Sequence, residues 1–267
     1  MGTVYRDVCD DDNSNTLSKE ETAMVTATQL AKVAGTRTPG RYAEEIAATT
    51  NRWAAFYGVR TSSDLSMFFA NVTVETGGFK LMSENMNYSA ARLRQVWPSR
   101  FPTTASTKGF ANNPRALANK VYGSRLGNKG RPDAGWLYRG SGPGQVTGYD
   151  NFLTCEKLTG IPFTTDPDLM RDPVFGTRAA LALWQKFGMS KYSKTADVTA
   201  ARKRWNGGAH GLEQTRAAFF RAVKLGLSVP PAAPAPAPAP LMPEPSPAPE
   251  PAPFVATVPV VAAVQRV

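Results

Sequence analysis

The sequence predicts a mainly α-helical domain of about 200 residues that contains a small irregular or β element. Apolar residues recur three or four positions apart in many segments of residues 25–227, whereas alternating strand patterns are scarce. Capping residues and glycines stand where several of these segments begin and end. The Gly-rich stretch 123–148 lacks helical spacing, so we expect the irregular or β element there.

The two ends of the chain differ in composition from this domain. Residues 1–24 carry two basic and six acidic residues, and 13 of the 22 prolines lie within residues 228–267. We therefore divide the chain into an acidic leader at 1–24, a globular domain at 25–227 and a Pro/Ala-rich linker or tail at 228–267. The leader and the tail are expected to be disordered.

The individual helices follow from capping signals and from apolar spacing. Ser62-Ser63-Asp64 can cap the start of a helix with an apolar stripe, and Gly77-Gly78 can end it. Asn113-Pro114 begins a similar segment, which Gly123 can stop. Further helices are expected at residues 40–58, 89–97, 149–159, 174–187, 196–205 and 212–225.

The residue inventory excludes several classes of active site. His210 is the only histidine, which excludes a metal site built on two or more histidines. A catalytic Cys-His pair would have to join it to Cys155, and we instead expect both Cys155 and Cys9 to be free thiols. The chain has no G-x-x-x-x-G-K-[ST] phosphate loop. We therefore expect no metal and no organic cofactor, which leaves carboxylate chemistry.

The net charge of +10 is concentrated in residues 25–227, which carry +15. Such a field attracts polyanions, and charge alone leaves nucleic acid, anionic lipid and the phosphate-bearing polymers of a bacterial envelope as candidates. A basic surface that only confers solubility is the simpler alternative. Because no recognised nucleic-acid-binding motif occurs, we expect no nucleic-acid partner.

Targeting and membrane-spanning segments are not expected. The N-terminus has neither a basic start nor an apolar stretch long enough for a signal peptide. The apolar stretch 254–264 is 11 residues long and contains Pro259, whereas a spanning helix needs roughly 20 residues. We therefore expect synthesis in the cytoplasm and no stable membrane span.

Glu75 and Glu84 form the candidate carboxylate pair. Glu75 extends an apolar stripe near a helix C-terminus, where burial and the helix dipole both disfavour a negative charge. The sequence therefore predicts a protonated Glu75, as a general acid requires. Glu84 follows the turn in a polar stretch and is expected to be solvated and ionised. Spacing alone favours the simpler interpretation, in which Glu75 is a helix-end residue and Glu84 a surface charge.

Four short segments carry more information than the rest of the chain. They are Val74-Glu-Thr-Gly-Gly-Phe79, Glu84-Asn-Met-Asn-Tyr-Ser89, Tyr138-Arg-Gly-Ser-Gly-Pro-Gly-Gln-Val-Thr-Gly148 and Asn206-Gly-Gly208. In this order and at these separations they resemble glycoside hydrolase family 19, in particular the short phage and bacterial endolysins that share a fold with plant chitinases. Residues 119–128 add a fifth similarity, and the resemblance spans about residues 26–225. It implies a lysozyme-like helical domain.

The resemblance also implies roles for individual residues. Glu75 falls at the family's general acid, Glu84 at its general base and Thr147 at the hydroxyl residue that helps to hold the attacking water, with inversion at the anomeric carbon. Amide side chains suit a sugar site because they donate and accept at once. The family's sugar-contacting positions fall on Gln145, Asn151, Asn206 and Arg216. For these residues the alternative is ordinary loop or helix-cap bonding.

Three positions depart from the family pattern. Val74 stands where the family usually has His, which could alter the protonation of the acid. Gly144 replaces a bulky aliphatic residue and could loosen the loop that carries Gln145 and Thr147. Trp205 is also unusual, and we expect it to pack in the core at a helix end.

The leading interpretation is a monomeric endolysin that hydrolyses the β-1,4 bonds of peptidoglycan glycan strands and lyses a host bacterium. By the resemblance, it would accumulate in the host cytoplasm and reach the wall after a separate pore protein opens the membrane. Its basic domain would also contact anionic envelope polymers. The nearest alternative is a chitinase, although plant chitinases have longer loops and several disulfides. A second alternative is a decayed wall-binding or virion-associated protein.

Overall fold

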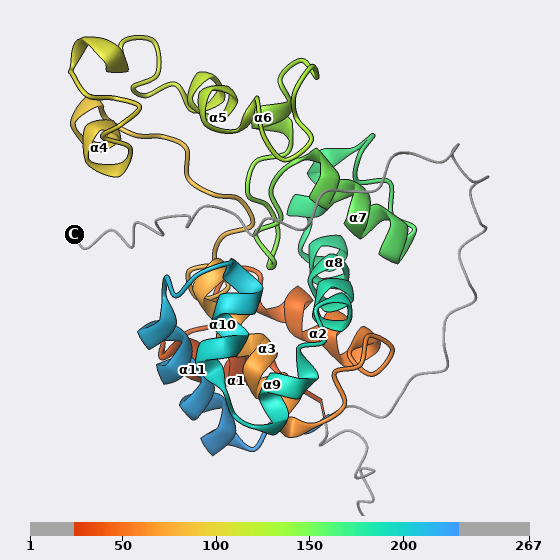
Figure 1. The fold of residues 1–267 in the computed structure, drawn as a ribbon. Helices are drawn as coiled ribbons and strands as arrows, with labels where there is room; N and C mark the ends of the chain where they lie inside the picture. The colour runs from red at the N-terminus through yellow and green to blue at the C-terminus, as the bar shows by residue number, and fades with distance from the viewer. Residues whose placement is uncertain (1–23, 230–267) are drawn as a thin grey trace, which may run out of the picture.

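The computed structural model describes residues 24–229, in which the chain is mainly α-helical, as the sequence predicts (Figure 1). Most of the leader predicted at 1–24 and of the tail predicted at 228–267 lies outside the described residues. The helices are α1 (Ala27–Ala34), α2 (Ala43–Trp53), α3 (Ser62–Glu75), α4 (Ala90–Val96), α5 (Pro114–Tyr122), α6 (Ala134–Leu137), α7 (Tyr149–Thr159), α8 (Pro173–Lys186), α9 (Ser190–Lys194), α10 (Val198–Asn206) and α11 (Leu212–Leu225). Two 3-10 helices, η2 (Ala105–Thr107) and η3 (Pro167–Arg171), complete the order.

Local capping explains why the helices begin where they do. Thr61 caps α3 through a capping box with Asp64, one residue before the start that the sequence predicts. Asn113 caps α5, Pro114 occupies its first turn and Gly123 follows its end, as predicted. The helices that the sequence missed are α1, α6 and α9, of which the last two have only four and five residues.

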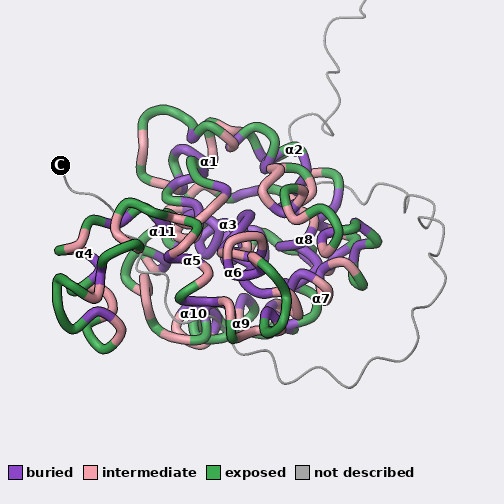
Figure 2. The backbone as a smooth tube through the Cα atoms, turned by 90° about the horizontal axis from the view of Figure 1, so that it is seen from above, coloured by how far each residue is buried: buried purple, intermediate pink, exposed green. Residues whose placement is uncertain are grey.

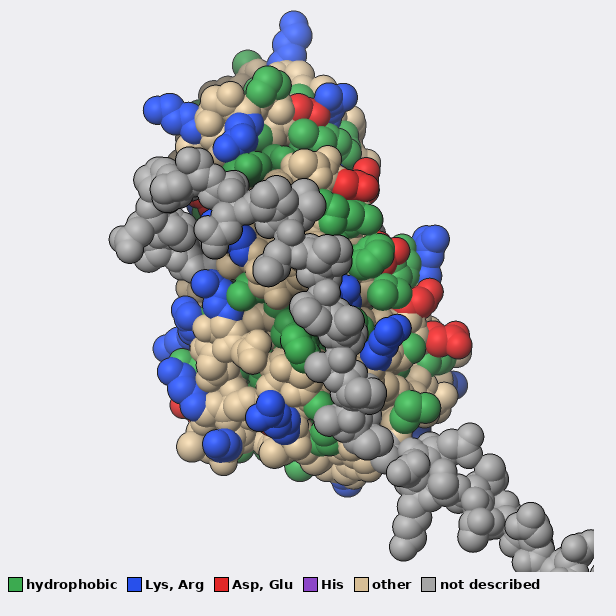
Figure 3. Space-filling view, turned by 90° about the vertical axis from the view of Figure 1, so that its right-hand side faces the viewer, with side chains coloured by type: hydrophobic (Ala, Val, Ile, Leu, Met, Phe, Trp, Pro, Cys, Tyr) green, Lys and Arg blue, Asp and Glu red, His purple; other side chains and the backbone are tan. Residues whose placement is uncertain are grey.

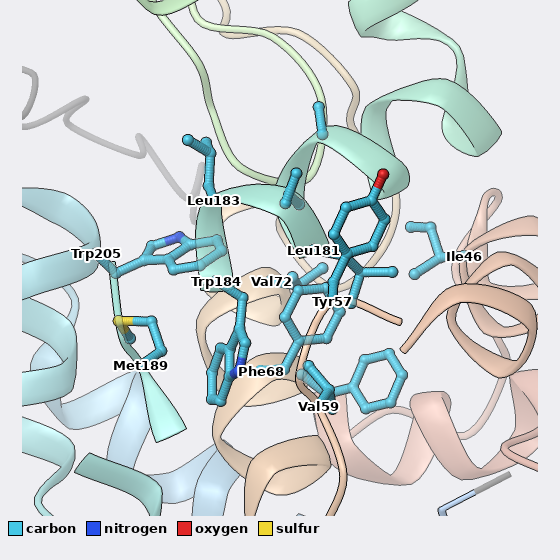
Figure 4. Close-up of a cluster of buried hydrophobic side chains, with 14 of the residues drawn as sticks. Ile46, Tyr57, Val59, Phe68, Val72, Leu181, Leu183, Trp184, Met189 and Trp205 are labelled. Atoms are coloured by element: carbon cyan, nitrogen blue, oxygen red, sulfur yellow. The ribbon is translucent and has the colours of Figure 1, made fainter. Parts of the chain in front are cut away.

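Helix α3 runs through the centre of the larger hydrophobic core. Its side chains from Asp64 to Thr73 are all buried, and α11 packs along it (Figure 2). Figure 4 shows Phe68 and Val72 of α3 among Trp184 of α8 and Trp205 of α10. Because α3 is buried from its second turn onward, its C-terminal residue is held in a fixed position.

A second, smaller core stands apart from the first. It is built from residues 86–136, which include α4, η2, α5 and α6 and which we name the small lobe (Figure 1). Its buried members are Met86, Tyr88, Leu93, Phe101, Leu117, Ala118, Val121 and Tyr122. The remaining described residues form the main lobe, so the chain leaves the main lobe after Asn85, next to Glu84, and re-enters it at Leu137, the last residue of α6.

The β structure of the described residues is limited to isolated bridges. Ser141 pairs with both Ser83 and Val146 in antiparallel bridges. Ser141 and Val146 lie in the stretch 123–148, where the sequence predicts an irregular or β element, and Ser83 lies outside it. These bridges join the segment of Glu84 to the Gly-rich turn that follows the small lobe. Two chain segments more than 50 residues apart in sequence are thereby held side by side.

The surface of the described residues is predominantly basic. In the face shown in Figure 3, Lys and Arg side chains are widely spread, whereas most of the acidic side chains in view gather along one edge. None of the helices within residues 24–229 has the length and hydropathy that crossing a membrane would require. Cys155 is a buried free thiol, as the sequence predicts, and burial raises its pKa to about 12.

Candidate active site

Glu75 is the last residue of α3, and its carboxylate is paired with an arginine. Arg202 Nη1 of α10 donates to Glu75 Oε1 at 2.6 Å, and the side chains of Glu75 and Arg202 are only 7% and 1% exposed. Oε2 of Glu75 accepts no hydrogen bond from any described residue. The sequence analysis placed Glu75 at this helix end but did not anticipate its cationic partner, which lies 127 residues away in the sequence. The protonated state that it expects for Glu75 stays a prediction.

Arg202 is itself fixed by the loop that follows α10 and by α3. Its Nε donates to the carbonyl of His210 at 2.8 Å, and its Nη1 also approaches Asn71 Oδ1 at 3.4 Å. Gly211 packs so closely that an added Cβ would lie 2.7 Å from Val74 Cγ1, and its φ of +73° also favours glycine. A buried guanidinium with three oxygen partners is a rigid support for one carboxylate oxygen.

Glu84 lies at the junction of the two lobes and is held by neutral donors. Its Oε1 accepts from the backbone N–H of Gly140, and its Oε2 accepts from the hydroxyl of Tyr122 at 2.9 Å. The backbone N–H of Glu84 also donates to the carbonyl of Gly140 at 2.9 Å. Tyr122 belongs to α5, so the small lobe supplies one of the two donors that orient this carboxylate.

The environment of Glu84 differs from the solvated one that the sequence analysis predicts. Burial raises the pKa of Glu84, against the opposing hydrogen bonds from Gly140 and Tyr122 and the charge of Arg139. Burial likewise raises the pKa of Tyr122 well above its usual value. Glu84 is half-buried, and sequence reasoning did not anticipate its two donors because Tyr122 and Gly140 come from distant parts of the chain.

The Gly-rich turn after the small lobe brings Gln145 near Glu84, and Thr147 is bonded to the backbone of Gln145. An added Cβ on Gly140 would lie 2.9 Å from Gln145 Oε1 and 3.2 Å from the carboxyl carbon of Glu84, so a larger residue here would displace the ends of these two side chains. Gln145 is buried, its Nε2 donates to the carbonyl of Gly142, and its Oε1 accepts no hydrogen bond within the described residues. The hydroxyl of Thr147 donates to the carbonyl of Gln145 at 3.2 Å.

The other three residues that the resemblance places at the sugar differ in their surroundings. Asn151 of α7 donates to the carbonyl of Thr147 at 2.7 Å, which ties it to the Gly-rich turn. Asn206 ends α10 one turn after Arg202, and its buried Nδ2 finds no acceptor within the described residues. Arg216 bonds Thr199 and Glu213 at 2.8 and 3.1 Å, and its role as a sugar contact stays a prediction.

The three departures from the family pattern also have defined surroundings. Val74 packs against Gly211, as described above. A Cβ at Gly144 would make ordinary contacts with Val146 and Ala180 at 3.5 and 3.7 Å. Trp205 lies in the core against Phe68 and Phe187, which confirms the predicted packing role. Its indole N–H has no acceptor among the described residues.

The candidate site residues fall into two groups, each held together by its own hydrogen bonds. The Glu75 group contains Glu75, Arg202 and Asn206, and the Glu84 group contains Glu84, Tyr122, Gly140, Gln145 and Thr147. Sequence reasoning missed Arg202, Tyr122 and Gly140 as functional residues, although the last two fall within segments that carry the resemblance. No set of three or more His, Cys, Asp and Glu residues within 24–229 is arranged to hold a metal ion.

Comparisons with known proteins identify the family of the chain. No family model matches it. A glycosyl hydrolase family 19 domain-containing protein of Haemophilus influenzae is 32% identical over 159 residues, which are 59% of this chain and 77% of that protein. Among solved structures, a family GH19 class IV chitinase from Zea mays is 17% identical with a TM-score of 0.47, over 78% of this chain and 94% of that one. Chitinase C from Streptomyces griseus HUT6037 is 16% identical with the same TM-score, over 78% of each chain. Because the Haemophilus relative is 32% identical over more than three quarters of its length, the chain belongs to glycosyl hydrolase family 19.

Proposed function

We propose that this glycoside hydrolase is an endolysin that cleaves the β-1,4 bond between N-acetylmuramic acid and N-acetylglucosamine in peptidoglycan. The observation that carries the proposal is the pair of carboxylates with contrasting partners. Glu75 is supported through one oxygen by a cation, and Glu84 is held through both oxygens by neutral donors. Two carboxyl groups in different surroundings are the requirement of a glycosidase that uses one as acid and one as base.

In the proposed reaction Glu75 is the proton donor. Arg202 occupies Oε1 and leaves Oε2 open, so Oε2 is the atom that would carry the proton to the leaving glycosidic oxygen. Glu75 then becomes a carboxylate directly beside the guanidinium, which stabilises the charge that forms.

Glu84 is the proposed base. Water attacks the anomeric carbon as the glycosidic bond breaks, its proton passes to Glu84, and the new hydroxyl has the inverted configuration. The raised pKa of Glu84 makes its ionised form a stronger proton acceptor than an ordinary carboxylate. The hydroxyl of Thr147, next to Gln145, is the proposed second partner of that water.

Unsatisfied polar atoms mark the proposed sugar contacts. Gln145 Oε1 and Asn206 Nδ2 are buried and lack partners within the described residues, which is costly unless a ligand or water bonds them. One is an acceptor and the other a donor, which suits the hydroxyl and acetamido groups of an aminosugar. Asn151 would act through the Gly-rich turn, to which it is bonded.

The experiment that tests the substrate compares peptidoglycan sacculi with chitin oligomers, using wild type, Glu75→Gln and Glu84→Gln, with the released ends identified by mass spectrometry. We expect new muramic-acid reducing ends from wild type and a loss of about 10³-fold in each variant. Cleavage of chitin alone would reassign the protein as a chitinase. A folded protein that cleaves neither substrate would instead support a wall-binding protein whose site has decayed.

We further propose that the enzyme acts on the wall of a host bacterium from inside, after a separate pore protein has opened the membrane. The chain is to be expressed in bacteria either alone, with a pore-forming protein, or behind an added export signal. We expect lysis in the last two cases only. Lysis by the chain expressed alone would contradict the dependence on a pore.

A further inference from the structure

The small lobe carries a disproportionate share of the positive charge. Residues 86–136 contain nine basic residues and one acidic residue, whereas the other 152 residues of 25–227 contain 19 basic and 12 acidic residues. The single acidic residue, Asp133, is already paired with Arg115 at 2.7 Å and bonded to Asn119. The remaining eight cations of the lobe form no ion pair with any described residue.

Arg125 of the lobe and Arg139 beside it lie next to the Glu84 group, because the backbone N–H of Arg125 donates to the carbonyl of Tyr122 at 3.1 Å and Arg139 directly precedes Gly140. A further cation, Arg92, acts on Tyr88, whose pKa is raised by burial and by Glu84. The charge of Arg125 acts on Tyr122 and that of Arg139 on Glu84 itself. All three arginines are partly exposed, and none forms an ion pair with a described residue. We name Arg92, Arg125 and Arg139 the arginine set.

Arg139 is partly buried beside another positive charge, and its own charged form is disfavoured as a result. Its guanidinium lies over the ring of Trp136 at 3.7 Å and bonds Ser83 and the carbonyl of Trp136, so its position is fixed. Burial and the neighbouring charge of Arg171 lower its pKa to about 10. A ligand that brings negative charge to this place would therefore be stabilised.

Guanidinium groups bind carboxylates in a planar, two-point arrangement. The peptides that branch from peptidoglycan carry free carboxylates beside the glycan strand, whereas chitin is uncharged. Because Arg125 bonds the backbone of Tyr122 and Arg139 directly precedes Gly140, these two arginines lie beside the two residues that hold the base. An anion that binds them can therefore be carried by the substrate itself.

We propose that the arginine set binds the carboxylates of the peptide branches, so that the enzyme selects an acidic, peptide-bearing glycan over a neutral one. This inference rests on the proposed function and adds the chemical feature of peptidoglycan that the site recognises. The small lobe then has two roles, because Tyr122 orients the base while Arg92 and Arg125 bind the substituents of the strand.

The test measures binding, so that it does not depend on cleavage. Sacculi are treated with hydrofluoric acid to remove phosphate polymers, and half are amidated to neutralise the carboxylates. Co-sedimentation is measured with the Glu84→Gln protein as the cleavage-deficient parent. Arg92→Gln/Arg125→Gln is added to this parent, and Lys108→Gln/Lys129→Gln provides the matched control, since it removes two exposed charges from the same lobe. Arg139 is left intact because it also acts on Glu84.

We expect the parent to bind the sacculi that were not amidated about fivefold more tightly than the amidated sacculi. An effect of this size is expected from two or three exposed ion pairs. The arginine variant should lose most of this preference and keep only the part that Arg139 supplies, and the lysine variant should keep the fivefold ratio. The inference would be overturned if the parent bound both kinds of sacculi equally, or if the lysine variant lost as much of the fivefold preference as the arginine variant. A preference seen only with sacculi that still carry their phosphate polymers would also overturn it. If the preference holds but wild type cleaves no peptidoglycan, the proposed function fails and the binding assignment stands.

Discussion

The two carboxylates of the site are held by opposite means. Glu75 belongs to the main lobe and meets a buried cation, whereas Glu84 lies at the junction of the lobes and meets a backbone N–H and a tyrosine hydroxyl. A cation favours the charged form of a carboxylate, and burial among neutral groups disfavours it. The comparison teaches that the small lobe sets the chemistry of the base, while α10 sets that of the acid.

The largest expected effect concerns the ion pair of the Glu75 group. Arg202→Ala leaves the Glu75 carboxylate buried without its partner, so we expect the free energy of unfolding to fall by about 3–5 kcal/mol. Chemical denaturation measures this change. The control is Arg202→Met combined with Glu75→Gln, which removes both charges and should lose much less. An equal loss in the double variant would mean that packing, and not the charge pair, supports this group.

The second prediction concerns Glu84, whose replacement should raise the free energy of unfolding and not lower it. Since burial raises the pKa of Glu84, its proton binds more tightly to the folded than to the unfolded chain. The resulting stabilisation is fully present below the unfolded-state pKa and is lost as the pH rises through the folded-state pKa. Glu84→Gln does not titrate, so near pH 8 we expect it to be more stable than wild type by roughly 1 kcal/mol.

Denaturation curves across the pH range test this sign. The advantage of Glu84→Gln should shrink as the pH falls and Glu84 becomes protonated in wild type. Glu75→Gln is the matched comparison and should be destabilised near neutrality, because it leaves Arg202 without its ion pair. If both variants shifted stability in the same direction, the contrast between the two groups would be refuted.

A third prediction separates the hydrogen bond of Tyr122 from its packing. The hydroxyl of Tyr122 lowers the pKa of Glu84, so Tyr122→Phe should raise this pKa further. Because the base has to be ionised, the low-pH limb of kcat/KM should move to higher pH. Tyr88→Phe is the control, since Tyr88 forms no hydrogen bond with Glu84. A Tyr122→Phe limb that stays in place would show that this bond does not tune the base.

The smallest expected effect comes from the charge of Arg139. It lowers the pKa of Glu84 less than Gly140 and Tyr122 do, so Arg139→Gln should move the low-pH limb in the same direction by less than Tyr122→Phe. High salt should reduce this shift and leave the effect of Tyr122 largely unchanged. A larger shift in Arg139→Gln would mean that charge outweighs hydrogen bonding at the base.

The sequence predicted the helices well because their signals are local. The capping residues of α5 and the apolar stripe of α3 lie within the helices that they define, and both were located within one residue. Helices α6 and α9 are too short to show a period of 3.6 residues. The small lobe was not predicted, because nothing local distinguishes its core from that of the main lobe.

The surroundings of the site depend on residues far apart in sequence. Glu75 was correctly placed at a helix end, but Arg202 reaches it from a helix 127 residues away. Glu84 stands in a polar segment, yet Tyr122 and Gly140 enclose it from 38 and 56 residues away. Single-sequence patterns carry no signal for such contacts, so the partners of both carboxylates could not be predicted, and the expected roles of Glu75 and Glu84 stay predictions.

The most direct test of the account is the configuration of the newly released reducing end, measured by NMR on soluble peptidoglycan glycan strands immediately after cleavage. The two-carboxylate mechanism predicts the α-anomer from the β-1,4 bond, with the rate lowered about 10³-fold in both Glu75→Gln and Glu84→Gln. A β-anomer from wild type, or near-normal activity in either variant, would contradict the assignment of Glu75 as donor and Glu84 as base.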